Sequence, residues 1–271
     1  MNTAAAHEPR TIVLLHGFPQ SSLCWNDVQR SLRAAGHHTV APDLRGYTPH
    51  DRPAEQEAYR SEAIADCLIS TLEHLGTPVD LVGHDWGGGV AWHIALRRPD
   101  LLRSLTAVST PHPAAYTRAL REDPEQRRKS EYIKFFTSAD ATDQLLADNA
   151  AGLRAVFSHS RMSAELISSY VGPLSTPAAL NAALAWYHAV DGAGSQPPGR
   201  CIVPTCYLWG DSDEAFSHAA AEGTAALVEG PYTFRVLRGG SHWLPDENPD
   251  EVASAVLELI ASTTARPSGG E

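Results

Sequence analysis

The stretch Leu-Val-Gly-His-Asp-Trp-Gly-Gly-Gly, residues 81–89, decides the fold of this chain. It follows an apolar run and precedes a helix-like pattern from Val90 to Leu96. Gly83 and Gly87 stand where side chains would collide if the chain reversed tightly between the two. The pattern therefore predicts a strand, a sharp turn and a helix, with Asp85 at the apex of the turn.

The residue at this apex determines the chemistry. In serine hydrolases the same turn, Gly-x-Ser-x-Gly, presents a serine nucleophile, whereas here it presents the carboxylate of Asp85. A serine alkoxide attacks acyl carbon, but a carboxylate is suited to displacement at saturated carbon, which leaves an ester on the enzyme. An aspartate in a glycine-rich turn can also serve only to form the turn, and the flanking strand and helix favour the nucleophile.

The chain is long and acidic. Its 271 residues can bury a large core, so one domain with an insertion is expected. The net charge of -11 argues against nucleic acid and anionic membranes as partners, because both bind basic surfaces. Residues 1–10 lack the apolar core of a signal peptide, and no segment is long and apolar enough to span a bilayer. We therefore expect a cytoplasmic protein that is a monomer or a homodimer.

The cysteines and histidines do not form a pattern typical of a metal site. The four cysteines are scattered and include no CxxC pair, which is typical of reduced packing residues in the cytoplasm. No two of these cysteines and the 13 histidines sit at ligand spacing with a third nearby. The sequence predicts neither a metal nor another cofactor.

Short apolar runs alternate with helix-like patterns on both sides of the middle of the chain. The runs expected to form strands are residues 11–15, 39–41, 78–82, 105–109, 201–209 and 232–237. Unbroken apolar runs of this length suit parallel strands that are covered on both faces. Strands that alternate with helices predict an α/β protein with a mostly parallel sheet and helices on both faces.

The alternation stops at residues 110–113, and only helical patterns follow up to Pro198. The helices expected there span residues 124–136, 142–157, 164–170 and 177–190. The glycine- and proline-rich run 192–199 has the composition of a linker. We therefore divide the chain into a core, residues 1–112 and 199–271, and an inserted all-helical cap, residues 113–198.

Five motifs together resemble those of the α/β-hydrolase family, in its branch of epoxide hydrolases and haloalkane dehalogenases. They are His-Gly-Phe-Pro at 16–19, Asp-Leu-Arg-Gly-Tyr at 43–47, Gly-His-Asp-Trp-Gly-Gly at 83–88, Trp-Gly-Asp-Ser-Asp at 209–213 and Gly-Ser-His-Trp at 240–243. They follow the order of the family, cover almost the whole chain and are most similar to those of epoxide hydrolases. The resemblance implies the α/β-hydrolase fold with an inserted helical cap.

The resemblance also implies a catalytic set. Asp85 would be the nucleophile, His242 the base and Asp213 the acid that orients the histidine, in the chain order that this fold uses. The chemistry agrees, because the ester on Asp85 must be hydrolysed by water and a carboxylate-oriented imidazole can remove the proton of that water. Backbone N–H groups of Phe18 and Trp86 would form the oxyanion hole.

Other polar residues near these motifs have competing or structural roles. Asp211 follows the same predicted strand as Asp213, but Asp213 has the spacing of the family. His16 and His84 are interpreted as structural residues.

A departing alkoxide needs proton donors, and epoxide hydrolases place two cap tyrosines over the nucleophile for this purpose. Residues 130–136 and 183–188 resemble the segments that carry them, with Tyr132 and Tyr187 at the tyrosine positions. Packing is the other role open to a cap tyrosine, but a tyrosine at both places favours function. The resemblance thus implies an enzyme that opens small apolar epoxides to vicinal diols. The residues expected to bind the substrate are Phe18, Trp86 and Trp186.

Two other functions stay open. Phe18 stands where haloalkane dehalogenases have a halide-binding asparagine, and Trp86 stands where fluoroacetate dehalogenases have an arginine. Because Trp86 still offers one indole N–H, a haloalkane or haloacid dehalogenase that uses Asp85 is the first alternative. The second is a small-molecule-binding protein without turnover, although a binder has no need for a base beside a carboxylate.

Two features depart from the pattern of the family. His188 follows Tyr187 where an arginine is usual. Only about ten residues precede the first expected strand, whereas family members usually carry two further strands there. We therefore expect a sheet of about six strands, all parallel, that lacks the first two of the family. The strand around Val40 would then lie at the edge of the sheet.

Overall fold

A parallel sheet forms the centre of the protein in the computed structural model, which describes residues 8–76, 78–189 and 199–264. Its strand order within these residues is β2-β1-β3-β4-β5-β6, and each neighbouring pair is parallel. The strands are β1 (Thr11–Leu15), β2 (His38–Val40), β3 (Val79–His84), β4 (Leu102–Val108), β5 (Thr205–Gly210) and β6 (Tyr232–Leu237). The expectation of six parallel strands is confirmed for the described residues.

Burial explains which strands lie in the middle of the sheet. Every residue of β3 and of β5 is buried, as expected for unbroken apolar runs that are covered on both faces. In β2, by contrast, His38 and Val40 are exposed. The predicted edge strand around Val40 is thus confirmed within the part of the chain that the structure describes.

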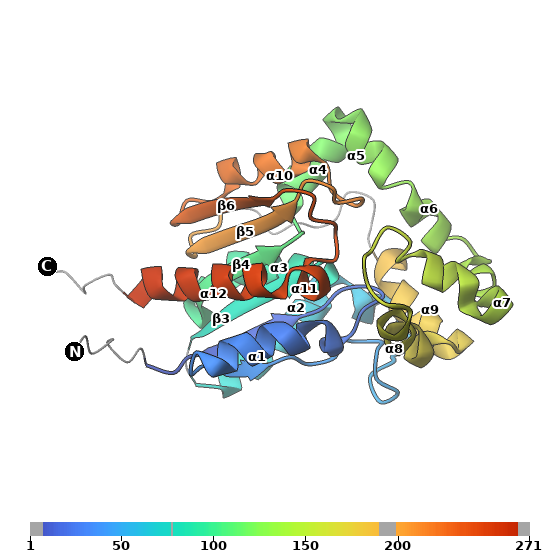
Figure 1. Cartoon of the computed structure of the whole chain (residues 1–271), viewed down its shortest axis with the longest axis horizontal. Helices are drawn as coiled ribbons and strands as arrows, with labels where there is room; N and C mark the ends of the chain where they lie inside the picture. The colour runs from blue at the N-terminus through green and yellow to red at the C-terminus, as the bar shows by residue number, and fades with distance from the viewer. Residues whose placement is uncertain (1–7, 77, 190–198, 265–271) are drawn as a thin grey trace, which may run out of the picture.

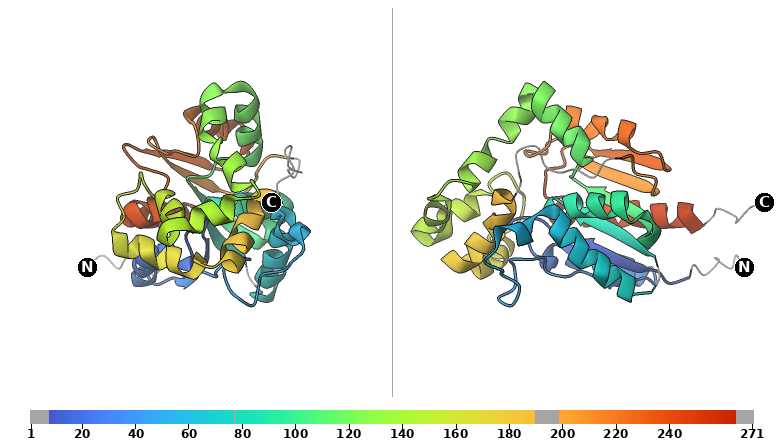
Figure 2. Two further views of the ribbon diagram at one scale, coloured as in Figure 1. Left: turned by 90° about the vertical axis from the view of Figure 1, so that its right-hand side faces the viewer. Right: turned by 180° about the vertical axis from the view of Figure 1, so that it is seen from behind.

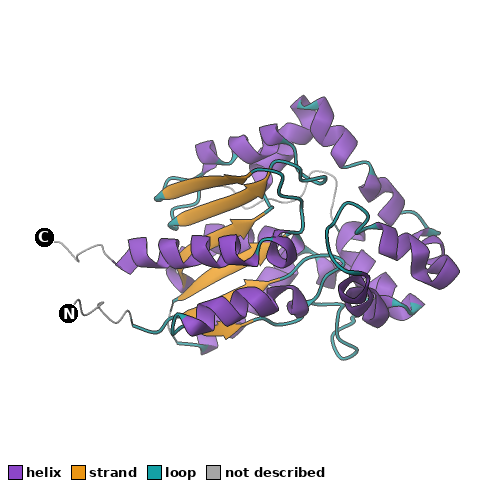
Figure 3. Cartoon of the chain, viewed as in Figure 1, coloured by secondary structure: helices purple, strands orange, loops and turns teal. Residues whose placement is uncertain are grey.

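Two layers of helices cover the sheet (Figures 1 and 3). Helices α1 and α12 pack together on one face, while α2 and α3 pack together on the other. The core helices are α1 (Asn26–Ala34), α2 (Ser61–His74), α3 (Trp86–Arg97), α10 (His218–Gly223), α11 (Leu244–Glu247) and α12 (Pro249–Thr264). Short 3-10 helices complete the core at η1 (Ser22–Trp25), η2 (Gln56–Tyr59), η3 (Pro99–Leu101) and η4 (Ala225–Leu227). None of the helices built from described residues has the length and apolar character needed to cross a membrane.

A group of helices follows β4 and extends from α10 to one end of the sheet (Figure 2). They are α4 (Pro113–Glu122), α5 (Pro124–Lys129), α6 (Tyr132–Phe136), α7 (Ala141–Ala155), α8 (Ala164–Leu174) and α9 (Pro177–His188). We use the word cap for these helices. They fall within the range 113–198 assigned to the cap from the sequence, of which residues 190–198 lie outside the described residues. The predicted linker at 192–199 therefore falls outside them too, except for Gly199.

The helical cap differs in detail from the sequence prediction. The single helix expected over residues 124–136 is wrong: α5 ends at Lys129 and α6 begins at Tyr132. Ser130, between them, has the non-helical angles φ -95° and ψ 3°. Helix α4 was not predicted, because the prolines before it read as a loop. Helix α7 contains a kink with non-helical backbone at residues 147–150.

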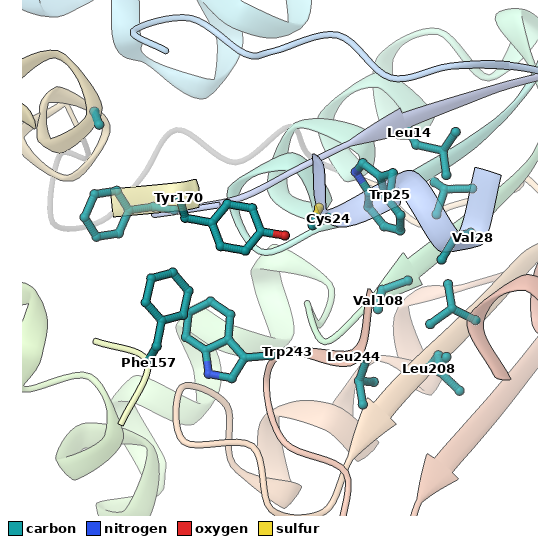
Figure 4. Packing of buried hydrophobic residues seen from close by; sticks show 14 of the residues in the cluster. Leu14, Cys24, Trp25, Val28, Val108, Phe157, Tyr170, Leu208, Trp243 and Leu244 are labelled. Carbon is teal, nitrogen blue, oxygen red and sulfur yellow. The ribbon is translucent and has the colours of Figure 1, made fainter. Parts of the chain in front are cut away.

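Aromatic side chains join the cap to the core, as Figure 4 shows. The ring of Phe157 lies 4.8 Å from that of Trp243 and 5.8 Å from that of Tyr170. On the other side of the cap, the indole N–H of Trp186 donates a hydrogen bond of 2.9 Å to the carbonyl of Arg45. The cap and the sheet therefore share buried apolar and polar contacts, and the cap closes over the carboxyl ends of the strands.

Candidate active site

A sharp turn between β3 and α3 carries Asp85 at its apex. Asp85 has φ 51° and ψ -123°, in the positive-φ region that is unusual for a residue with a side chain. The turn is possible only with glycines beside it. A Cβ at Gly83 would lie 2.4 Å from the carbonyl oxygen of Gly87, and a Cβ at Gly87 would lie 2.3 Å from that of Leu15. The predicted strand, turn and helix are thus present, with α3 starting four residues earlier than Val90, at Trp86.

The carboxylate of Asp85 lies against the loop that follows β1. Its Oδ1 accepts a hydrogen bond of 2.9 Å from the backbone N–H of Phe18. His16 shapes this loop, because its Nε2 accepts the N–H of Leu44 at 2.9 Å. One of the two predicted oxyanion-hole donors, Phe18, therefore contacts Asp85, and Trp86 follows Asp85 in the chain.

His242 links Asp85 to Asp213. Its Nε2 lies 3.5 Å from Asp85 Oδ2, and its Nδ1 lies 3.0 Å from Asp213 Oδ2. The other oxygen of Asp213 accepts the N–H groups of Ala215 and Phe216, at 2.7 and 3.0 Å. Asp213 is fully buried. The competing residue, Asp211, is exposed and accepts the N–H of Gly239 instead, so Asp213 is the carboxylate that meets the histidine.

Opposite charges in the site favour the ionised forms of His242 and Asp85. Burial alone lowers the pKa of His242, but the carboxylates of Asp213 and Asp85 outweigh it and raise this pKa to about 10. Burial alone raises the pKa of Asp85, but the hydrogen bond and charge of His242 outweigh it and hold this pKa below its ordinary value. The resting site thus contains an ionised Asp85 and a protonated His242 at neutral pH.

Two polar side chains, His84 and Ser109, hold the backbone at His242, and the role of Ser109 was not predicted from the sequence. His84 Nε2 lies 2.8 Å from the carbonyl oxygen of His242, and Ser109 Oγ donates to the same oxygen at 2.9 Å. Burial, followed by the charge of His242, lowers the pKa of His84 to about 4. A neutral His84 can donate from Nε2 to that carbonyl. This position is consistent with the structural role expected for His84.

The two cap tyrosines lie together above the turn. Tyr187 and Tyr132 have ring centroids 6.2 Å apart, and Tyr187 lies 5.0 Å from Trp86 and 5.4 Å from Phe18. Phe136 contacts both tyrosine rings, at 5.0 and 5.3 Å. The structure therefore brings both predicted tyrosines to the aromatic layer that covers Asp85.

Burial keeps both phenols protonated. It raises the pKa of Tyr187 well above the ordinary value, with Tyr132 and Asp85 adding to the effect. It does the same for Tyr132, with contributions from Tyr116 and Asp85. A protonated phenol in a dry site is a hydrogen-bond donor, so the layer above Asp85 can act on an oxygen atom that becomes negative.

The tryptophans next to these residues differ in their polar contacts. Among the described residues, the buried indole N–H of Trp86 has no hydrogen-bond partner. Trp186, which is 2% exposed, uses its N–H on Arg45 and lies 5.7 Å from the ring of Trp86. Trp86 thus contacts the ring of Tyr187 directly, whereas Trp186 contacts Trp86 and the backbone of Arg45. Within the described part of the chain, no group of three or more His, Cys, Asp and Glu side chains is arranged to hold a metal ion.

Known proteins are similar to this chain in sequence. The profile of a family described as alpha/beta hydrolase fold matches residues 10–249. The AB hydrolase superfamily protein YfhM of Bacillus subtilis is 34% identical over 261 residues, which cover 92% of this chain and 89% of that protein. Epoxide hydrolase 3 of Xenopus tropicalis is 30% identical over 262 residues, which cover 92% of this chain and 71% of that protein.

Solved structures give the same result. The epoxide hydrolase of Bacillus megaterium, in complex with an inhibitor, is similar with a TM-score of 0.85 and 27% identity, covering 94% of each chain. A variant of that enzyme was solved with its product, a naphthyloxy-propane-1,2-diol, and is similar with a TM-score of 0.85 and 26% identity over 94% of each chain.

Proposed function

The chain belongs to the α/β-hydrolase fold family, and from this premise we propose that it is an epoxide hydrolase that opens small apolar epoxides to vicinal diols. Relatives that are named epoxide hydrolases support this activity. The reaction would use amino-acid side chains and water, without a cofactor. Together with this activity, we propose a monomeric or homodimeric protein of the cytoplasm that does not bind nucleic acid, in keeping with the net charge of -11.

One observation carries the proposal. A single carboxylate, that of Asp85, lies between a backbone donor, an imidazole and a layer of phenols. Its Oδ1 contacts the N–H of Phe18 at 2.9 Å, and its Oδ2 lies 3.5 Å from His242. Tyr187 packs against Trp86, the residue after Asp85, and Tyr132 lies 6.2 Å from Tyr187. A nucleophile with proton donors close to it is what ring opening of an epoxide requires.

In the first step, Asp85 attacks one epoxide carbon. A bond forms between the carboxylate oxygen and this carbon, while the bond between the carbon and the epoxide oxygen breaks. The oxygen leaves as an alkoxide and takes a proton from Tyr187 or Tyr132. Because Tyr187 is buried and Tyr132 is partly buried, their hydrogen bonds to the developing anion are stronger than they would be in water. The product is an ester between the substrate and Asp85.

In the second step, water hydrolyses this ester. Esterification removes the negative charge of Asp85, which is one of the two charges that raise the pKa of His242. The imidazole can then lose its proton and act as a base, oriented by Asp213 at 3.0 Å. His242 removes a proton from water, which attacks the carbonyl carbon of the ester. The N–H groups of Phe18 and Trp86 would bind the resulting oxyanion until the bond between the ester carbon and the substrate oxygen breaks, and this oxygen then takes the proton that His242 removed from water, which releases the diol.

A dehalogenase is the second candidate, and the unpartnered indole N–H of Trp86 is the observation that favours it. A halide needs neutral N–H donors, and Trp86 would supply one. The phenols of Tyr187 and Tyr132 favour an oxygen leaving group, because they can donate a proton to it. Epoxide hydrolysis therefore accounts for more of the site than dehalogenation does.

The test is a panel of epoxides and haloalkanes, scored separately for diol and for halide, in the presence of EDTA. We expect diol from an aryl epoxide such as styrene oxide, with a rate that EDTA does not change. Halide release without diol formation would replace the proposal by the dehalogenase. Stoichiometric binding of epoxides without any turnover would point to a binding protein.

A further inference from the structure

Cap helix α5 holds the loop that carries Asp213. Gln126, on this helix, is fully buried, and its amide meets the loop at two places. Its Nε2 donates to the carbonyl of Ala215 at 2.8 Å, and its Oε1 accepts the N–H of Ser217 at 2.8 Å. An amide that pairs with one carbonyl and one N–H of the same backbone segment fixes both the position and the direction of that segment.

The segment that Gln126 holds is the one that orients the acid. Asp213 Oδ1 accepts the N–H groups of Ala215 and Phe216, at 2.7 and 3.0 Å. These hydrogen bonds leave Oδ2 free to face His242, at 3.0 Å. The backbone between Asp213 and Ser217 therefore determines where the carboxylate points, and Gln126 contacts it at Ala215 and Ser217.

Other side chains of the same helix reinforce this contact. Lys129 donates from Nζ to the carbonyl oxygen of Asp213 itself. Asp123, which caps α5, accepts the hydroxyl of Ser217 at 2.6 Å. Three side chains from one short polar helix thus bind the loop at both of its ends.

We propose that Gln126, assisted by Lys129, is a positioning residue that holds the carboxylate of Asp213 against His242 during hydrolysis of the ester. This inference rests on the proposed function, because it assigns Gln126 to the second of the two proposed steps. It also gives the cap a second task. Besides carrying Tyr132 and Tyr187, the cap would hold Asp213, which belongs to the core, in position.

The expected consequence is specific to one step. Attack of Asp85 on the substrate needs no base, so the rate of alkylation stays unchanged when the loop that carries Asp213 becomes less rigid. Activation of water by His242 depends on the position of Asp213. Small displacements of a catalytic group cost up to about 100-fold in rate. We expect loss of the Gln126 amide to slow ester hydrolysis by roughly 10-fold to 100-fold.

The test substitutes Gln126→Met, which keeps the length of the side chain and removes both hydrogen bonds. Single-turnover kinetics gives the rate of alkylation, and intact-protein mass spectrometry gives the fraction of enzyme that carries substrate at steady state. We expect an unchanged alkylation rate, a lower kcat and an accumulating adduct. Lys129→Met, at a residue nearer the surface, is expected to act in the same direction and to fold in any case.

Gln29→Met is the matched control. Gln29 is also a buried glutamine with side-chain hydrogen bonds, one of them to Thr39 at 2.9 Å, but it lies at the far edge of the sheet. We expect Gln29→Met to lower the free energy of unfolding without accumulation of the adduct. Equal slowing of alkylation and ester hydrolysis in Gln126→Met would mean that the substitution loosens the whole site, and it would overturn the inference. Wild-type levels of the adduct in both α5 variants would overturn it as well. His242→Gln separates the two hypotheses: if it accumulates no adduct, the proposed function itself fails.

Discussion

The phenol ring of Tyr187 lies 5.0 Å from the indole ring of Trp86, with the two ring planes at 83°. Tyr187 belongs to the cap, and Trp86 follows Asp85 at the start of α3. This edge-to-face contact joins the cap to the sharp turn that carries Asp85. In the proposed function, Asp85 attacks carbon and Tyr187 gives a proton to the leaving oxygen, so this contact would relate the two groups.

Removal of either cap phenol tests this relationship. Tyr187→Phe and Tyr132→Phe keep the aromatic ring, so we expect the fold and substrate binding to remain. Each should slow alkylation on the order of 10²–10³, which is the usual cost of losing one donor to a developing anion. Tyr232→Phe is the control, because its buried hydroxyl has no hydrogen-bond partner in the described structure. Unchanged turnover in both cap variants would reduce the two tyrosines to packing residues.

Removal of the base should separate the two steps. His242→Gln leaves Asp85 ionised and able to attack, but general-base help is worth roughly 10²–10⁴ in rate. We expect this variant to accumulate a covalent adduct of one substrate mass, which digestion would place on the peptide that contains Asp85. Asp85→Ala should show no adduct. An adduct on a serine would contradict the assignment of the nucleophile.

The sequence predicted the ends of strands β1 and β6 best. Strand β6, residues 232–237, has the predicted ends, because turn residues bound its short apolar pattern on both sides. The helix predicted over residues 124–136 was wrong for a tertiary reason. Ser130, at the break after Lys129, has its hydroxyl 3.0 Å from the hydroxyl of Tyr116 in α4, a contact between residues 14 positions apart. No local pattern contains this information.

The stability of the cap–core junction should depend on pH through Asp246. Tyr170, from the cap, donates to both oxygens of this carboxylate, and Gln20 donates to Oδ2. Burial raises the pKa of Asp246 to about 6, above the value of about 3.9 expected for an unfolded chain. The folded state therefore binds the proton more tightly, and the associated stability is lost as the pH rises from about 4 through about 6.

Asp246→Asn removes this dependence. Asparagine can still accept from Tyr170, and its amide can donate to Gln20 Oε1, which is buried without a partner in the described structure. We expect the variant to be more stable than wild type by roughly 1–3 kcal/mol above pH 6, with a difference that disappears below about pH 4. Urea unfolding across this pH range is the measurement. A difference that grows toward acid would contradict the account.

The turn at Asp85 should tolerate no side chain at Gly87. A Cβ there would lie 2.3 Å from the carbonyl oxygen of Leu15 and 2.5 Å from that of His16, and backbone atoms cannot move aside cheaply. We expect Gly87→Ala to lower the free energy of unfolding by about 3 kcal/mol or more. Gly89→Ala, two residues on, meets nothing within 4 Å and should stabilise α3 by roughly 0.5–1 kcal/mol. Equal effects in urea unfolding would show that the turn is not tightly packed.

The site could be predicted only where a motif marks it. Asp85, His242 and Asp213 each follow the end of a strand at a characteristic spacing, so their types and order were readable from the sequence. The roles of Ser109 and Gln126 were not, because they depend on contacts between distant parts of the chain. Gln126 and Ser217 are 91 residues apart, and nothing near Gln126 in the sequence points to the loop of Asp213.

The origin of the new oxygen in the diol tests the central claim, an ester on Asp85, most directly. In a single turnover with excess enzyme in water enriched in oxygen-18, the oxygen added to the substrate should come from Asp85. Water then replaces that oxygen in the carboxylate, since it attacks the carbonyl carbon of the ester. We expect a diol without oxygen-18 and a labelled peptide containing Asp85. Oxygen-18 in the diol of the first turnover, with Asp85 unlabelled, would mean that water attacks the epoxide directly and would contradict the account.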